Sequence, residues 1–410
     1  MISSVLPSPG SRPVQARRVA VIGSIGYSLV NFRLDLMRRM ADLGHDVLAV
    51  APDIDPETAA TLERYGIRHC AVPMNRTGTR PLADLRTLAA LVRVLRAEAP
   101  DIVLPYTMKP IVYGSLAARM ARVPECYPLF TGLGYAFAGE ARGRRRAVRT
   151  IAVTLHRLGT GRATAAFHYN DAEARDIRHY RLVPAHVPLV KIPGSGIDTD
   201  RFSAMPLPDG PLRFLFVGRL LSSKGLDVLA LAVRRLRSEG RAVTVDLLGL
   251  DDSNPDAVDP ATLAAWEEEG LVRRLGAVRD VRARLAAAGV VVLPTTLREG
   301  VPRTILEAMA TGRPVITTDA PGCGETIDDE VSGLVVPQGN AAALAAAMRR
   351  FLDAPGLAAE MGRAARAQVC RRHDVHRVNA LILGRMGLEP EGGAMTTQSR
   401  KVPLGGKVTA

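Results

Sequence analysis

The chain has 410 residues, more than one hydrophobic core usually supports, so we expect two domains. Its formal net charge of +13 at pH 7 favours anionic partners, while an aromatic content of only 4% argues against a nucleic-acid-binding protein that stacks bases on aromatic side chains. The four cysteines lie far apart without a CxxC pair, which argues for a reducing compartment and against structural zinc.

In the first half, short apolar strands alternate with helical patterns. The predicted strands are 18–22, 45–51, 101–104 and 125–130, and the predicted helices are 31–44, 56–65, 82–99 and 111–121. Such an alternation predicts parallel strands with helices on both faces of the sheet. The first residues are rich in serine and proline and lack the apolar core of a signal peptide, so we expect a loose tail there.

The same alternation restarts at 212–217 after a stretch rich in glycine and proline. Further strands are predicted at 243–248, 290–294, 315–318 and 333–336, and helices at 226–240, 260–269 and in the alanine-rich segment 341–369. We therefore predict an α/β protein with two doubly wound, Rossmann-like domains that face each other across a cleft. The predicted boundaries are a disordered tail at 1–16, an N-terminal domain at 17–195, a linker at 196–210, a C-terminal domain at 211–375, a C-terminal helix at 376–388 and a disordered tail at 389–410. No run of about 18 apolar residues is present, so we predict no membrane-spanning helix.

The segment 299–314 is the strongest candidate for chemistry. It lies between two predicted strands and carries Glu299 in a loop, Pro302 in the expected first helical turn, and Glu307 on the helix. A helix start beside a sheet edge favours anions, and a phosphate is a natural guest. Because two carboxylates would repel a phosphate, we interpret the glutamates as acceptors of hydroxyl groups from a sugar and a ribose. An exposed loop residue and a solvated helical residue are the alternative.

A second candidate is the loop 218–225, which follows the first strand of the second half. Arg219 and Lys224 are cations five positions apart, and together they can hold a diphosphate, because arginine offers a planar fork and lysine a point charge. The carboxyl ends of parallel strands meet at one edge, so we expect this loop beside Glu299.

The basic run Arg142–Arg149 leads into an apolar-rich helical segment at 151–158. A basic amphipathic segment without a spanning helix is typical of contact with an anionic membrane surface. A solvated helix face explains the pattern equally well, and nucleic-acid binding comes third. The chain has no P-loop motif, no GxSxG and no HExxH, and its two DxD sequences lie in turn-like settings, so we assign no metal.

Several motifs together resemble one family. Glu299 and Glu307, with Gly-Val-Pro and Ala-Met-Ala-Thr-Gly around them, resemble the E-x7-E signature of retaining GT-B glycosyltransferases of family GT4. The loop 218–225 is similar to the diphosphate loop of that family, and residues 319–325 to its D-x-P-G-C-x-E turn, although Gly324 replaces the usual arginine. In the first half, Asn-Phe-Arg-Leu at 31–34, the Lys-Pro at 109–110 and 131–137 resemble the exopolysaccharide and lipid-linked oligosaccharide branch, with Ile111 where that branch commonly has asparagine.

The resemblance spans residues 18–385 and implies a role for each site. A nucleotide sugar, most often UDP-linked, is the implied donor. Glu307 is expected to bind the ribose, Glu299 the transferred sugar, and Arg219 with Lys224 the leaving diphosphate, without a metal or other cofactor. The remaining donor-binding residues are Gly218, Gly300, Val301, Pro302 and Arg303. The implied acceptor-binding residues are Gly23, Ser24, Lys109, Thr131, Gly132 and Tyr135.

The expected function is transfer of a hexose or N-acetylhexosamine, with retention, to a polyprenyl-diphosphate-linked sugar during exopolysaccharide, capsule or O-antigen assembly. We expect the protein to be cytoplasmic and peripheral on the inner face of the plasma membrane, without a nucleic-acid partner. Two alternatives stay open: a GT-B-fold UDP-sugar 2-epimerase, which needs no acceptor, and a basic nucleic-acid-binding protein that uses Arg142–Arg149.

Overall fold

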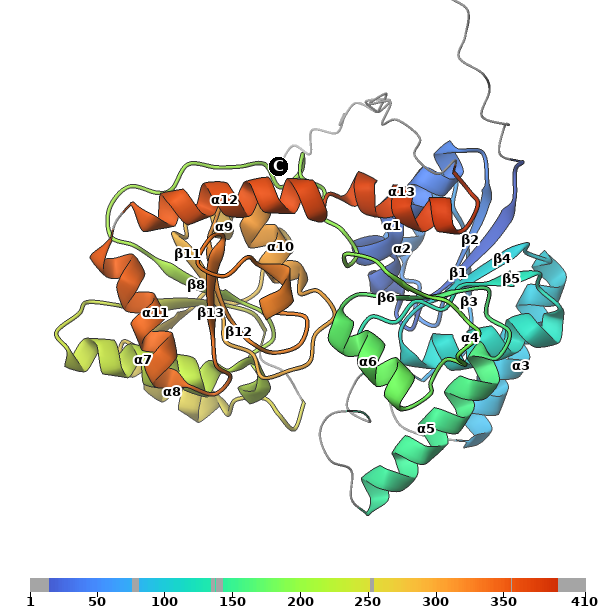
Figure 1. The fold of residues 1–410 in the computed structure, drawn as a ribbon, viewed down its shortest axis with the longest axis horizontal. Helices are drawn as coiled ribbons and strands as arrows, with labels where there is room; N and C mark the ends of the chain where they lie inside the picture. Colours follow the sequence, from blue (N-terminus) through green and yellow to red (C-terminus); the bar gives the residue numbers. More distant parts are fainter. Residues whose placement is uncertain are drawn as a thin grey trace, which may run out of the picture.

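Two parallel β-sheets form the two halves of the molecule (Figure 1). The computed structural model describes residues 15–75, 81–133, 137, 143–250, 254–354 and 356–389. The first sheet has the strand order β3-β2-β1-β4-β5, and the second has the order β10-β9-β8-β11-β12-β13. In both sheets the first strand in sequence lies in the middle and the chain winds outwards in both directions, which confirms the doubly wound α/β prediction.

The strands of the first sheet are β1 (Arg18–Ile22), β2 (Asp46–Ala51), β3 (Arg68–Ala71), β4 (Ile102–Pro105) and β5 (Glu125–Cys126). Those of the second sheet are β8 (Phe214–Val217), β9 (Val245–Leu248), β10 (Val272–Arg274), β11 (Val290–Leu293), β12 (Val315–Thr318) and β13 (Gly333–Val336). The strands β6 (Ala166–His168) and β7 (Leu189–Lys191) form a small parallel pair. All residues of β4, β11 and β12 are buried, as expected for parallel strands that helices cover on both faces.

Helices cover both faces of each sheet. In the first half they are α1 (Gly26–Asp42), α2 (Pro56–Arg64), α3 (Pro81–Glu98), α4 (Met108–Ala121), α5 (Arg144–Thr160) and α6 (Asp171–His179). In the rest of the chain they are α7 (Leu226–Ser238), α8 (Pro260–Glu268), α9 (Arg282–Ala286), α10 (Arg303–Ala310), α11 (Ala341–Asp353), α12 (Leu357–Arg372) and α13 (Val375–Arg385). Several of them begin at a side-chain cap, for example Asp55 on α2 and Asn340 on α11.

Some predicted boundaries were wrong. Helix α1 begins at Gly26 rather than at residue 31, and α4 begins three residues earlier than predicted. Strand β5 has only two residues instead of the predicted six. After Cys126 the backbone pairs with neighbouring segments at single positions, such as Leu129 with Phe167, and not as a continuous strand. Helix α5 already begins at Arg144, so much of the basic run is its first turns. Strands β6, β7 and β10 and helix α9 were not predicted, since each is short. Strand β3 and helix α6 were not predicted because their sequences, Arg-His-Cys-Ala and Asp-Ala-Glu-Ala-Arg-Asp-Ile-Arg-His, are mostly polar and carry little apolar periodicity.

Within the described ranges the chain crosses between the halves twice, and the two crossings touch. The backbone N–H of Ile197 donates to the carbonyl of His373 at 2.9 Å, and that of Val375 donates to Ile197 at 3.0 Å. Gly196 has a φ of +73°, and a Cβ there would lie 2.7 Å from the Cα of Val375, so this position needs glycine. Beyond the second crossing, α13 packs on α1, and Val378 and Ile382 join the core of the first half (Figure 1).

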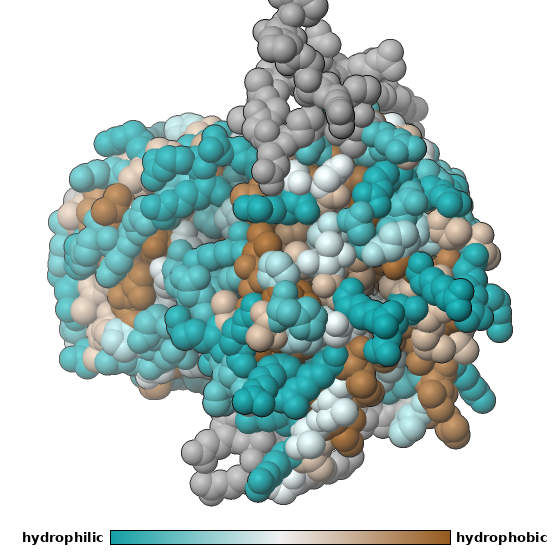
Figure 2. Space-filling model, turned by 45° about the vertical axis from the view of Figure 1, so that its right-hand side comes forward, coloured by the Kyte–Doolittle hydropathy of each residue, from teal (hydrophilic) through white to brown (hydrophobic). Residues whose placement is uncertain are grey.

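Hydrophilic side chains dominate the face in Figure 2, with hydrophobic ones in small separate groups. Among the described residues, no helix is both long and apolar enough to cross a membrane.

Candidate active site between the two sheets

The loop after β11 carries Glu299 to the boundary between the two halves. A Cβ on Gly300 would lie 2.6 Å from the ring of Tyr169 in the first half, and one on Gly322 would lie 2.2 Å from the carbonyl oxygen of Glu299. Both positions therefore need glycine, because other segments of the same chain leave no room for a side chain there. The backbone N–H of Glu299 donates to Pro321 at 3.0 Å, which fixes the start of the loop.

Lys224 lies directly against Glu299. The ammonium group of Lys224 donates to a carboxylate oxygen of Glu299, and the two side chains are only 16% and 22% exposed. The loop that carries Lys224 is fixed to the end of β11, because Thr296 donates its backbone N–H to Ser223 at 2.9 Å. At the next position, Gly225 has a φ of +81°, and a Cβ there would lie 1.9 Å from the carbonyl oxygen of Pro294. The structure thus brings the predicted diphosphate loop and the first glutamate together.

The other residues of the diphosphate loop follow β8. The N–H of Gly218 donates to Leu248 at 3.0 Å, and a Cβ on Gly249 would lie 1.9 Å from the carbonyl oxygen of Gly218. Two glycines thus let the ends of β8 and β9 approach closely. Arg219 is exposed in the loop between Gly218 and Lys224, at the same sheet edge.

Glu307 lies on α10 and is paired within that helix. Its carboxylate accepts a hydrogen bond from Arg303 Nε at 3.0 Å, and its side chain is 14% exposed. Burial raises the pKa of Glu307, and the neighbouring guanidinium of Arg303 opposes that effect. Arg303 also donates from Nη1 to the carbonyl oxygen of Asn31 in the first half at 2.6 Å, so the Glu307–Arg303 pair lies at the boundary of the halves.

The structure corrects the prediction for Pro302 and shows where Val301 lies. Pro302 caps α10 in an extended conformation and is not in its first turn, because the helix begins at Arg303. Val301 lies against the segment that leaves the first half, since a Cβ on Gly194 would be 2.8 Å from its side chain.

The predicted acceptor residues Gly23 and Ser24 lie at the carboxyl end of β1. Gly23 donates its N–H to Val50 at 2.8 Å, and a Cβ there would meet the hydroxyl of Tyr106 at 2.4 Å. The hydroxyl of Ser24 accepts a hydrogen bond from Thr107 at 3.0 Å. These residues lie at the edge of the first sheet where β1 and β4 end.

Thr131 and Gly132 lie nearer to the second half than these two. The carbonyl oxygen of Thr131 would be 3.3 Å from a Cβ on Gly300, and the N–H of Gly132 donates to Glu173 at 2.6 Å. Tyr135 lies outside the described residues, as does Arg142 of the basic run.

Lys109 does not join the other predicted acceptor residues. Its ammonium group donates to Asp84 at 2.8 Å, and both side chains are mostly buried. This ion pair links α4 to α3. Lys109 could bind an acceptor phosphate only if its ammonium group contacted both the phosphate and the carboxylate of Asp84.

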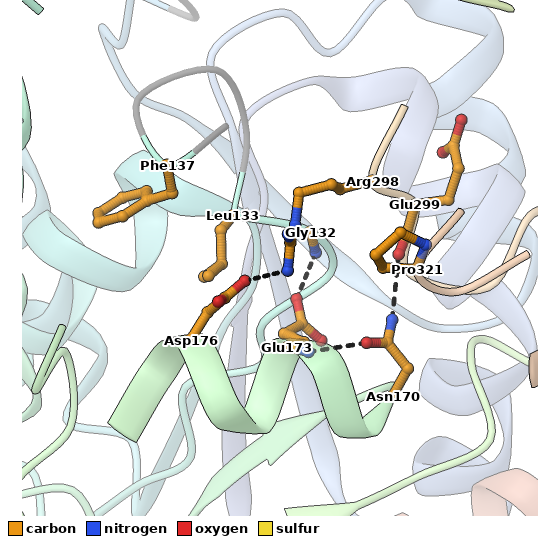
Figure 3. A pocket seen from close by; sticks show the side chains of 9 residues that line it. All are labelled: Gly132, Leu133, Phe137, Asn170, Glu173, Asp176, Arg298, Glu299 and Pro321. Atoms are coloured by element: carbon orange, nitrogen blue, oxygen red, sulfur yellow. Dashed lines mark hydrogen bonds and ion pairs between the residues drawn. The ribbon is translucent and has the colours of Figure 1, made fainter. Parts of the chain in front are cut away.

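A small pocket lies between the halves and joins the predicted donor and acceptor walls (Figure 3). Gly132, Leu133 and Phe137 line it on one side and Glu299 and Pro321 on the other. Asn170, Glu173, Asp176 and Arg298 complete the lining, and sequence reasoning missed all four. The run Asn-Asp-Ala-Glu at 170–173 has the spacing of a capping box, which could have predicted the start of α6 but not what it contacts.

Within the described ranges, no three histidine, cysteine or acidic side chains gather where they could hold a metal ion. The arrangement offers instead a lysine and an arginine at one sheet edge, two partly buried carboxylates, and a pocket that opens between the halves. Such a site can bind an anionic leaving group and several hydroxyl groups at once.

Comparisons with known proteins address both halves. Residues 30–193 match the family described as "Glycosyl transferase 4-like domain", and residues 211–354 match "Glycosyl transferases group 1". The N,N'-diacetylbacillosaminyl-diphospho-undecaprenol alpha-1,3-N-acetylgalactosaminyltransferase of Campylobacter jejuni is 25% identical over 82% of this chain and 89% of its own length. The amylovoran biosynthesis glycosyltransferase AmsK of Erwinia amylovora is 26% identical over 87% of this chain and 96% of its own length.

Solved structures agree with the fold. Anabaena Alr3699/HepE in complex with UDP superimposes with a TM-score of 0.69 at 20% identity, covering 90% of this chain and 99% of that one. The apo form of the lipopolysaccharide outer core galactosyltransferase WaaB has a TM-score of 0.64 at 16% identity, with the same coverage of both chains. At these identities the likeness shows the two-domain fold.

Proposed function

Because the chain belongs to the group 1 and 4-like glycosyltransferases and has their GT-B fold, we propose that it transfers a hexose or N-acetylhexosamine from a UDP-sugar, with retention, to a lipid-linked sugar acceptor in the assembly of a bacterial surface polysaccharide. Family membership favours this function over the epimerase and the nucleic-acid-binding protein. The observation that carries the proposal is the contact of Lys224 with Glu299 at the edge of the second sheet, opposite Gly132 across the pocket.

The geometry supports a division of work in the donor site. When the glycosidic bond breaks, negative charge grows on the leaving diphosphate, and Lys224 and Arg219 can stabilise it from the loop after β8. Glu299 accepts hydrogen bonds from the transferred sugar, and Glu307 from the ribose. In the unliganded protein Lys224 is already fixed by Glu299. Its charge is therefore held in the site before a donor arrives, and little reorganisation is needed.

The proposed lipid-linked acceptor is supported by a similar protein and by the surface of α5. The Campylobacter jejuni relative is named for a diphospho-undecaprenol acceptor. In the present chain Ile151 and Leu158 are exposed on one side of α5, and Arg146 and Arg157 are exposed on the adjacent side of the same helix. An exposed helix surface on which arginines adjoin an aliphatic side suits an anionic lipid surface. We assign this face to membrane contact near a lipid-linked acceptor.

The function is tested with purified protein, a set of UDP-, GDP- and ADP-sugars, and a polyprenyl-diphosphate-linked sugar. We expect one UDP-sugar to raise the melting temperature, because a ligand that binds only the folded state stabilises it by mass action. With the lipid acceptor, the same donor should yield an elongated lipid-linked product. Release of a free epimerised sugar without acceptor would instead identify the epimerase.

Transfer is expected to continue in the presence of EDTA, because Arg219 and Lys224 supply the positive charge for the leaving diphosphate. The measurement is the initial rate of transfer before and after dialysis against EDTA, with a metal-dependent glycosyltransferase assayed in parallel as a control. A rate that is lost on dialysis and returns with Mg²⁺ or Mn²⁺ would show that these cations do not suffice.

A further inference from the structure

The first turns of α6 contact both walls of the pocket. Asn170, Glu173 and Asp176 are three residues apart, so they lie along one side of the helix, and each contacts a different part of the pocket (Figure 3). Helix α6 belongs to the first half by its chain position, but two of these three residues bind the second half.

Asn170 binds the loop of Glu299 through its side-chain amide. The nitrogen Nδ2 donates to the carbonyl oxygen of Glu299 at 3.0 Å and to that of Gly300 at 2.9 Å. The oxygen Oδ1 accepts the N–H of Glu173 at 2.8 Å and so caps α6. Asn170 is only 3% exposed, so water does not compete well for these bonds. An aspartate or a serine could cap the helix, but neither could donate to both carbonyls.

Glu173 binds the opposite wall. Its carboxylate accepts the N–H of Gly132 at 2.6 Å and that of Tyr169 at 2.8 Å, and the residue is buried. One turn further along, Asp176 pairs with Arg298, which precedes Glu299. A single helix therefore holds the acceptor-side loop with one side chain and the donor-side loop with two others.

Other ties between the halves differ in strength. Arg279 pairs with Glu57 across the boundary, but these side chains are 89% and 74% exposed, and such pairs contribute little. Arg303, four residues after Glu299, donates to the carbonyl oxygen of Asn31 in the first half. Asn170, among the described residues, is a buried side chain of the first half that bonds directly to the backbone of Glu299.

We propose that Asn170 is a positioning residue, which holds the Glu299 loop against the Gly132 wall and so sets the transferred sugar in line with the acceptor. The inference rests on the proposed role of Glu299 in transfer. Asn170 acts through the loop and need not touch the substrates.

The test compares N170D and N170S with N340D. Each variant at residue 170 keeps an oxygen for the cap of α6. N170D loses both donated hydrogen bonds, and N170S can keep at most one of them while adding no charge. Asn340 caps α11 in the same way at an exposed position, so N340D is a matched change of a cap away from the pocket. We expect kcat to fall about 10- to 100-fold in both variants at residue 170, with little change in the donor KM, because a misplaced reacting group lowers the rate more than the affinity.

Amide hydrogen exchange of the unliganded protein provides a readout that does not need turnover. Exchange in residues 297–301 should become faster in N170D and N170S and stay unchanged in N340D, while all three variants stay folded at the assay temperature. Unchanged exchange in this loop, or a kcat equal to that of the wild type, would overturn the inference. If the wild type itself transfers no sugar, the proposed function fails, and exchange alone decides whether Asn170 holds the loop.

Discussion

Replacing Lys224 with alanine is expected to lower kcat by about 10²–10³-fold, the loss seen when one group that stabilises a developing negative charge is removed. The reason is that the ammonium group lies against Glu299 at the sheet edge, where the diphosphate is proposed to leave. The same change leaves the Glu299 carboxylate without this partner. Initial rates at saturating donor and acceptor provide the measurement, and R219A should act in the same direction.

The matched control is K191A. Lys191 also pairs with a carboxylate, that of Asp171, but both side chains are about half exposed or more and lie outside the pocket lining. Its loss should leave kcat within about twofold, because exposed pairs contribute little to stability or geometry. Turnover that survives both K224A and R219A with folded protein would refute the assignment of the diphosphate loop.

Replacing Glu307 with alanine is expected to lower kcat/KM for the donor by about 100-fold or more, since hydrogen bonds to a charged group contribute about 1.5–3 kcal/mol each. The specific readout is a donor with 2′-deoxyribose. The wild type should be impaired with this analogue, whereas E307A should treat the two donors almost alike, because the group that binds the hydroxyl is already gone. An analogue penalty that is equal in both proteins would place the ribose elsewhere.

Two further observations separate a binding role of Glu307 from a structural one. E269A removes a glutamate that also pairs with an arginine, but at an exposed site, and it should not affect the donor KM. Because burial raises the pKa of Glu307, its carboxylate becomes protonated at a higher pH than an ordinary glutamate. Donor affinity in the wild type should therefore weaken as the pH falls through this raised pKa, and E307A should lack that dependence.

Much of the fold could be predicted from sequence because the long elements carry strong local patterns. The apolar runs of β1, β4, β11 and β12 are buried on both faces. A parallel strand of this kind can be predicted from its own continuous apolar sequence, without knowing which strands it pairs with. The convergence of Lys224 and Glu299 was predictable for a related reason, since loops after neighbouring parallel strands meet at one edge of the sheet.

The contacts across the boundary could not be predicted in this way. Asn170 and Glu299 are 129 positions apart, and their contact depends on how two separately folded sheets face each other. The pairing of Lys109 with Asp84 depends likewise on how α3 packs on α4. Strand β6 is too short to distinguish from a loop, and α6 is mostly polar and lacks a clear apolar stripe, although it proved central to the pocket.

Helix α13 returns to the first half, so elements from both sides of the second lobe in sequence build the first lobe. In topological terms the second lobe is an insertion, which enters and leaves through the touching segments at Ile197 and His373–Val375. If the chain were cut once between the two sheets, the N-terminal fragment would lack Val378 and Ile382. The part of its core that these side chains cover would then be exposed. The segment between the crossings, in contrast, is continuous, so it is the piece suited to separate expression for calorimetry of binding of the proposed nucleotide-sugar donor.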